Sequence, residues 1–254
     1  MKLSTILVVH TLQKWRVRVL QKPKVLLFDT FGTLTDWRGS ITREGERLSR
    51  LKGLESVDWD KFAREWRAGY FPGMAPVIAG ERPFTSIDVI HRERLDVILE
   101  DFDIGDAFDE SERVNFNLIW HRLDPWPDVV PGMLELNRDY LLAPLSNGTI
   151  ILLSSIAKRA GIPFDFIFSS DTFRAFKPDP AVYLGAINML GLEPTEVMLV
   201  AAHNSDLKAA QSHGMQTAYV NRPTEFGVDQ DKDFGPEGDW EYVTETVTEL
   251  AGLL

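Results

Sequence analysis

The chain has 254 residues and no cysteine, which excludes disulfides, thiolate catalysis and zinc sites built on cysteine. Hydrophobic residues make up 44% of the chain and charged residues 26%, as is typical of a soluble globular protein with one large domain or a core with an insertion. The formal net charge of −11 argues against nucleic acid as a general partner, because an acidic surface repels phosphate backbones.

The first 24 residues differ in charge from the rest of the chain. They carry six lysines and arginines and no acid, so the remainder carries a formal charge of −17. Their apolar run LSTILVV is too short to span a bilayer. We interpret residues 1–23 as an extension ahead of the first strand. A basic, acid-poor segment also fits a targeting peptide, which leaves the expected cytoplasmic location open.

Apolar runs that end in polar turns predict five buried strands. They are residues 24–28, 140–145, 164–170, 197–202 and 216–220. Helical patterns lie between them, among them residues 150–160, 181–190 and 206–213. The alternation predicts an α/β fold with a Rossmann-like, doubly wound parallel sheet. In such sheets ligands bind beyond the carboxyl ends of the strands.

The segment 38–123 shows helical patterns and no convincing buried strand, which indicates a helical cap inserted after the first strand. Three prolines within residues 124–133 mark the return to the core. We therefore predict a core domain of residues 24–37 and 124–254 and a cap domain of residues 38–123. The acidic stretch 224–240 is interpreted as a solvated loop.

Polar residues suited to catalysis fall at strand ends or in loops above one edge of the predicted sheet. They are Asp29, Thr33, Ser146, Lys177 and Asp206. In this order they resemble the four motifs of the haloacid dehalogenase superfamily, which read DxxGT, a strand ending in Ser or Thr, a Lys and an Asp. The resemblance covers nearly the whole chain from residue 24 onward, and it implies the fold predicted above.

Each of these residues also has a purely structural explanation. Asp29 could begin a turn, and Ser146 and Asp206 could cap helices. The sequence KPDP after Phe176 is also a helix start, with Asp179 as the N-cap and Pro180 in the first turn. The joint pattern, rather than any one motif, favours a functional site.

Two apolar residues stand where phosphatases of the superfamily carry acids. A phosphatase has a second Asp two residues after the nucleophile, because an alkoxide leaving group needs a proton, and here that place holds Phe31. It also holds Mg²⁺ with a fourth motif written GDxxxD, and here the first acid position is Ala202. A halide leaves without a proton, and an apolar neighbour does not repel it. The pattern resembles the L-2-haloacid dehalogenase branch, which implies no metal and no cofactor.

The resemblance to this branch also implies substrate-binding residues. Arg67, in a Trp-Arg pair of the cap, would pair with the halide and the substrate carboxylate, although it could instead lie on a solvated helix face. Ser146 would donate a hydrogen bond to the carboxylate, and Asn147 would face the halide. Tyr183, six residues after Lys177, completes the third motif, but it could equally be a core residue.

The fourth motif departs from the branch. Where members often carry Ser and Asn, this chain has Ala201 and His203. A histidine beside an ester is a plausible base near neutral pH, so His203 either activates water or only packs at the strand end. Asp206 is the alternative base.

These residues together predict hydrolytic dehalogenation of short 2-haloalkanoic acids. Asp29 would attack C2 in an SN2 displacement and form an ester, with inversion, and water would then release a 2-hydroxy acid. The expected partner is the small 2-haloacid, with neither nucleic acid nor membrane, and a homodimer is left open. The alternatives are a phosphatase with degenerate motifs and an inactive binding protein.

Overall fold

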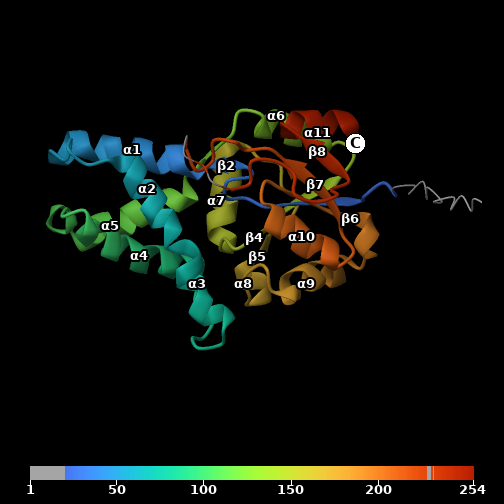
Figure 1. The fold of residues 1–254 in the computed structure, drawn as a ribbon, viewed down its shortest axis with the longest axis horizontal. Helices are drawn as coiled ribbons and strands as arrows, with labels where there is room; N and C mark the ends of the chain where they lie inside the picture. Colours follow the sequence, from blue (N-terminus) through green and yellow to red (C-terminus); the bar gives the residue numbers. More distant parts are fainter. Residues whose placement is uncertain (1–20, 228–229, 231) are drawn as a thin grey trace, which may run out of the picture.

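The computed structural model describes residues 21–227, 230 and 232–254. The predicted extension, residues 1–23, therefore lies almost wholly outside the described residues. Figure 1 shows two parts side by side: a sheet covered by helices, and a group of helices, α1 to α5, that projects beyond it.

The main sheet has six strands in the order β5-β4-β1-β6-β7-β8, and each neighbouring pair is parallel. The strands are β1 (Val25–Phe28), β4 (Leu141–Ser146), β5 (Phe168–Ser169), β6 (Val197–Ala201), β7 (Gln216–Val220) and β8 (Tyr242–Thr244). In the sheet, β1 pairs with β4 on one side and with β6 on the other. The strand order thus reverses at β1, the position at which such sheets bind ligands.

Helices cover both faces of the sheet (Figure 1). Because strand side chains alternate between faces, Leu26 and Phe28 pack in one hydrophobic cluster and Val25 and Leu27 in another. The first cluster includes residues of α6 (Val129–Leu136), α7 (Ile150–Ala160) and α11 (Val247–Leu253). The second includes residues of α9 (Pro180–Leu190) and α10 (Asn204–Ser212). The predicted doubly wound α/β fold is confirmed.

A helical segment follows β1, after the short strand β2 (Thr35–Asp36), and ends at β3 (Asp124–Pro125), which pairs with β2 in antiparallel fashion. Its helices are α1 (Trp37–Lys52), α2 (Trp59–Ala68), α3 (Tyr70–Ile78), α4 (Ile87–Asp101), η1 (Gly105–Ala107), α5 (Glu110–Asn117) and η2 (Leu118–His121). The aromatic side chains of this cap pack on one another, for example Phe62 on Phe116. The insertion predicted after the first strand is confirmed as part of the fold; the domain bounds at 37/38 and 123/124 remain a prediction.

Local signals explain where the core helices begin and end. Asp179 caps α9 by accepting a hydrogen bond from Ala181 N, and Pro180 occupies the first turn, as predicted. Gly191 then ends α9 in the left-handed conformation. Two short helices, α8 (Ser170–Phe173) and η3 (Pro194–Glu196), complete the chain.

Two expectations about the core were wrong, and one strand was missed. The strand predicted at 164–170 is only two residues long, because Asp165 instead binds the backbone of Leu142 and Ser170 begins α8. The strand β8 was not predicted. The helix expected at 206–213 begins two residues earlier, at Asn204, so Asp206 lies in its first turn and is not its N-cap.

The contact between α6 and α11 gives a stability prediction. A Cβ on Gly132 would lie 2.6 Å from the backbone carbon of Val247, which cannot move without displacing α11. We expect Gly132→Ala to lower the unfolding free energy by about 1–3 kcal/mol, measured by urea denaturation. The matched control is Gly252→Ala in α11, where a Cβ meets nothing within 4 Å; it should be neutral or stabilising by up to about 1 kcal/mol. Equal stability of the two variants would contradict this packing argument.

Candidate active site

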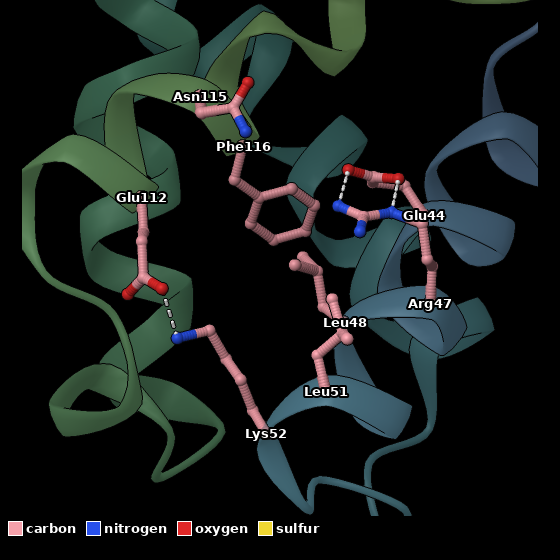
Figure 2. A pocket seen from close by; sticks show the side chains of 8 residues that line it. All are labelled: Glu44, Arg47, Leu48, Leu51, Lys52, Glu112, Asn115 and Phe116. Atoms are coloured by element: carbon pink, nitrogen blue, oxygen red, sulfur yellow. Dashed lines mark hydrogen bonds and ion pairs between the residues drawn. The ribbon is translucent and has the colours of Figure 1, made fainter.

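A hollow of about 260 Å³ lies within the cap, between α1 and α5 (Figure 2). Its charged groups neutralise one another: Arg47 pairs with Glu44 at 2.8 Å, and Lys52 pairs with Glu112 at 2.6 Å. With its charges paired in this way, the hollow offers a ligand little electrostatic attraction, and we do not assign it a function.

A larger cavity, of about 530 Å³, opens at the carboxyl ends of the strands. Its wall combines predicted residues from both parts of the molecule: Asp29, Phe31, Arg67, Asn147, Lys177, Tyr183, His203 and Asp206. Asp29 and Asp206, which are 177 positions apart in the chain, thus lie in one site. This site is at the edge of the sheet where the strand order reverses, next to the cap.

Asp29 follows β1 directly and is buried. Its Oδ1 accepts a hydrogen bond from Lys177 Nζ at 3.0 Å, and its Oδ2 accepts one from Thr33 Oγ1 at 2.8 Å. Burial alone would raise the pKa of Asp29, but the charge of Lys177 and the hydrogen bonds from His203 and Thr33 outweigh burial and lower that pKa. Asp29 is therefore an anion at neutral pH.

Lys177 joins Asp29 to the fourth motif. Its Nζ also donates to Asp206 Oδ2, while Asp206 Oδ1 accepts a hydrogen bond from Tyr183 Oη at 2.6 Å. Burial would lower the pKa of Lys177, but the two carboxylates outweigh burial and raise it, so the ammonium stays charged. Tyr183 is buried in α9 and also donates a hydrogen bond to Asp206, so it is at once a core residue and part of this cluster.

His203 lies between two carboxylates. Its Nδ1 is 3.1 Å from Asp29 Oδ2, and its Nε2 is 2.9 Å from Glu225 Oε2. Both neighbours are acceptors, so an imidazolium satisfies both bonds. Burial would lower the pKa of His203, but Glu225 and Asp29 outweigh burial and raise it well above its ordinary value. In this resting arrangement His203 is a proton donor.

Glu225 corrects the prediction that residues 224–240 form a solvated loop. Its side chain is only 1% exposed and also accepts a hydrogen bond from Trp37 Nε1 at 2.9 Å. Gly32 makes the approach of Glu225 to the nucleophile loop feasible, because a Cβ there would lie 2.1 Å from Glu225 Oε1 and the backbone has φ +86°. Any other residue at position 32 would displace this carboxylate.

Thr33 and Arg222 fix the backbone around Asp29. Thr33 Oγ1 accepts a hydrogen bond from Ala202 N at 2.9 Å, so this hydroxyl links the end of β6 to Asp29. Arg222 donates from Nε to the carbonyl oxygen of Thr33 at 2.9 Å and pairs through both terminal nitrogens with Asp128. This two-pronged contact orients the guanidinium and, through it, the loop.

Arg67 comes from the last turn of α2 and is 9% exposed, so it does not lie on a solvated helix face. Its guanidinium carbon sits 3.9 Å above the ring centre of Tyr70. Its Nε and Nη1 have no hydrogen-bond partner among the residues that the structure describes. A buried cation without a carboxylate partner in a cavity is suited to bind an anionic ligand.

The second motif lies at the end of β4. Asn147 lines the cavity, and its Oδ1 accepts a hydrogen bond from the backbone nitrogen of Lys177 at 2.7 Å, which leaves its amide nitrogen 3.7 Å from Met74 Sδ. Ser146 is buried, and its Oγ accepts a hydrogen bond from Gly148 N at 3.3 Å. Unlike Asn147, Ser146 does not line the cavity, and its role toward a substrate remains a prediction.

Within residues 21–227, 230 and 232–254, no group of three or more His, Asp or Glu side chains is placed to hold a metal ion. No helix in the same residues is long and apolar enough to cross a membrane.

Residues 23–214 match a family described as haloacid dehalogenase-like hydrolases. The crystal structure of the defluorinating L-2-haloacid dehalogenase Rha0230 is 44% identical, with a TM-score of 0.88 over 91% of this chain and 95% of that one. The chain belongs to the haloacid dehalogenase-like hydrolases, in the L-2-haloacid dehalogenase branch.

Two further relatives agree with this assignment. The L-2-haloacid dehalogenase PA0810 is 41% identical, with a TM-score of 0.87 over 91% of this chain and 98% of that one. An (S)-2-haloacid dehalogenase from Xanthobacter autotrophicus is 29% identical over 203 residues, which are 78% of this chain and 75% of the relative. The predicted family and branch of hydrolases are confirmed.

Sequence reasoning missed two residues of this dehalogenase-family site, Glu225 and Tyr70. Arg67 lies in the last turn of α2 and Tyr70 opens α3, so their stacking depends on the turn at Gly69 between the two helices and not on a shared helical face. Glu225 gave no signal, because it is one of several acids in an irregular loop.

The raised pKa of His203 predicts a pH dependence of stability. Above about pH 6.5, the ordinary histidine value, the unfolded chain has lost a proton that folded His203 retains. The unfolding free energy should therefore fall as pH rises toward the folded pKa, by at most about 1.4 kcal/mol per pH unit. Urea denaturation of the wild type and of His203→Gln between pH 6 and 9 would measure the difference. Parallel pH profiles for the two proteins would mean that His203 is not held as an imidazolium.

Proposed function

We propose that this protein hydrolyses short 2-haloalkanoic acids to 2-hydroxy acids through an ester on Asp29, with inversion at C2. One observation carries the proposal: Asp29 is a buried anion in a cavity with Arg67, a cation that none of the described residues neutralises, and apolar Phe31 and Ala202 occupy the places of the phosphatase acids. Without those acids, phosphoryl transfer lacks its proton donor and a metal ligand. An SN2 displacement of halide needs neither.

Asp29 Oδ1 is the better candidate for the attacking oxygen. Oδ2 accepts hydrogen bonds from both Thr33 and His203, whereas Oδ1 accepts one from Lys177 among the described residues. The fewer hydrogen bonds an oxygen accepts, the more of its electron density is available to the substrate carbon. As the O–C2 bond forms, the C2–halogen bond breaks and its electron pair leaves with the halide.

Arg67 would hold the substrate carboxylate while this displacement proceeds. Its planar fork of N–H donors suits an anion, and Tyr70 fixes its plane by stacking beneath it. The amide of Asn147 and the hydroxyl of Ser146 would complete the contacts to the substrate from the core side.

Ester hydrolysis requires a base, and the structure favours His203 with Glu225 over Asp206. Asp206 is already engaged by Lys177 and Tyr183, so its part is to hold Lys177 against Asp29. Ester formation removes the charge of Asp29 and with it one of the two anions that raise the pKa of His203. His203 then releases the Nδ1 proton to solvent, which balances the charge of the departed halide, and its neutral Nδ1 can take a proton from the attacking water while Glu225 keeps the ring oriented through Nε2. Hydrolysis restores anionic Asp29 beside an imidazolium.

The test of the function is halide release. We expect the purified protein to release chloride from (S)-2-chloropropionate in the presence of EDTA, and Asp29→Asn to lose this activity while keeping its fold. In a single turnover in ¹⁸O-water the product should remain unlabelled, because its new oxygen comes from Asp29. Activity that EDTA abolishes and Mg²⁺ restores would favour the phosphatase, and a fully labelled first product would mean direct attack by water.

If His203 is the base, its replacement should trap the ester intermediate on Asp29. We expect His203→Asn to slow ester hydrolysis by about 10²–10⁴-fold while ester formation is affected less. Asp29 carrying the substrate mass without halogen should then accumulate and be detected by mass spectrometry. Glu225→Gln should show the same accumulation in weaker form, because the ring keeps a hydrogen-bond partner but not the charge. Unchanged turnover in His203→Asn would leave Asp206 as the remaining candidate base.

A further inference from the structure

The indole of Trp37 lies behind the wall of the catalytic cavity. Trp37 opens α1, directly after β2, and its side chain is fully buried. Neither Trp37 nor Glu225 lines the cavity. Phe226 does line it, and its ring meets that of Trp37 edge to face, with centroids 5.7 Å apart. Trp37 can therefore act on a substrate only through the residues that it contacts.

The indole N–H of Trp37 holds the carboxylate that orients the proposed base. Trp37 Nε1 donates a hydrogen bond to Glu225 Oε1 at 2.9 Å, and Glu225 Oε2 lies 2.9 Å from His203 Nε2. The other ring nitrogen of His203, Nδ1, is 3.1 Å from Asp29 Oδ2. Four side chains thus form a chain of hydrogen bonds from the start of α1 to Asp29. Because each oxygen of Glu225 has its own donor, rotation of this carboxylate would break a hydrogen bond.

The charges that pair with His203 are those of Asp29 and Glu225, one at each ring nitrogen. Asp29 is balanced in addition by Lys177 at 3.0 Å. Near Glu225, Arg38 donates to the backbone oxygen at 3.3 Å. Among the described residues, the neutral indole is thus the only side-chain donor to the Glu225 carboxylate besides His203. A hydrogen bond to a carboxylate stabilises its charge and so weakens its pull on a neighbouring proton.

The ring of the same tryptophan faces the cation expected to bind the substrate. The guanidinium carbon of Arg67 lies 5.8 Å from the Trp37 ring centre and 3.9 Å from that of Tyr70. Cations are attracted to aromatic faces within about 6 Å of the ring centre, and tryptophan attracts them most strongly. Trp37 therefore contacts Arg67 through its ring and Glu225 through its N–H.

We propose that Trp37 is a positioning residue that holds Glu225 beside His203 and supports the guanidinium of Arg67. This deepens the proposed function and rests on it. The two parts of the side chain serve different steps. The ring supports substrate binding through Arg67, and the N–H supports ester hydrolysis through Glu225.

Trp37→Phe removes the N–H and keeps an aromatic face. We expect ester hydrolysis, measured in a single turnover, to slow roughly tenfold, as the loss of one hydrogen bond to a charged group predicts. The KM for 2-chloropropionate should stay within about twofold of the wild-type value, because a ring still faces Arg67. The limb of the kcat profile on which His203 loses its proton should shift to higher pH, because Glu225 without this N–H attracts that proton more strongly.

Two further variants separate the ring from the N–H. Trp37→Leu removes both, so it should slow hydrolysis and also raise the KM roughly two- to fivefold, as the loss of a cation–π contact predicts. The matched control is Trp59→Phe, which removes the N–H of another buried cap indole, one that donates to Ser49. Its kinetics and pH profile should equal those of the wild type. An unchanged KM in Trp37→Leu would contradict the support of Arg67.

A double-mutant cycle tests whether the N–H acts through Glu225. In a Glu225→Ala background, Trp37→Phe should slow ester hydrolysis no further, because the N–H then has no carboxylate to hold. Equal slowing in both backgrounds would mean a general effect on packing and would overturn the inference. So would a Trp37→Phe protein with the hydrolysis rate and pH profile of the wild type. Trp37→Phe, the most conservative change, decides the matter even if Trp37→Leu fails to fold.

An NMR titration of His203 in the resting protein requires no turnover. We expect the pKa of His203 to be higher in Trp37→Phe than in the wild type, for the reason given above. If this rise is observed but the wild-type protein releases no chloride from 2-chloropropionate, the proposed function is refuted and the positioning of Glu225 by Trp37 stands. An equal pKa in the two proteins would count against the role of the N–H.

Discussion

The buried ion pair between Lys177 and Asp29 is the interaction on which the site depends. A carboxylate taken out of water is strongly destabilising unless charges and hydrogen bonds compensate for it. Here compensation extends outward in alternating sign, from Asp29 to Lys177 and Asp206 on one side and to His203 and Glu225 on the other. Each member holds the next in place, so the Asp29 carboxylate is both anionic and fixed. Removing Lys177 would leave Asp206 buried without its cation, and removing His203 would do the same to Glu225.

On the cap side of the site, in contrast, buried polar groups lack partners. Arg67 is a buried cation that the described protein does not neutralise, and its neighbours His91 and Trp120 are likewise unpaired. The core of the site is thus saturated with partners, while the cap side retains unsatisfied donors. This asymmetry would favour an anionic ligand on the cap side of the cavity, because the charge of Asp29 is already compensated and repulsion between two anions is reduced.

The long segment after β7 is tied to the core near Asp29 and His203. Arg222 at its start binds the nucleophile loop and Asp128 beneath α6, and Asp233 accepts hydrogen bonds from Asn204 at the start of α10. Glu225 lies between these two anchors. A stretch whose composition is that of a surface loop is therefore tied to the core at both ends, and its position sets that of the carboxylate beside His203.

The sequence alone determined the parts of this protein that depend on local pattern. The apolar run before Asp29, the cap at Asp179 and the helical periodicity of α7 each follow from residues within a few positions of one another, so the fold, the family and the positions of Asp29, Lys177 and Asp206 could be predicted. The tertiary structure decided what depends on distant packing: the shortened β5, the pairing of β8, and the approach of Glu225 to His203 across 22 positions. No periodicity marks an acid in an irregular loop or an indole without a partner, because burial and pairing of a side chain are set by whichever segments pack against it.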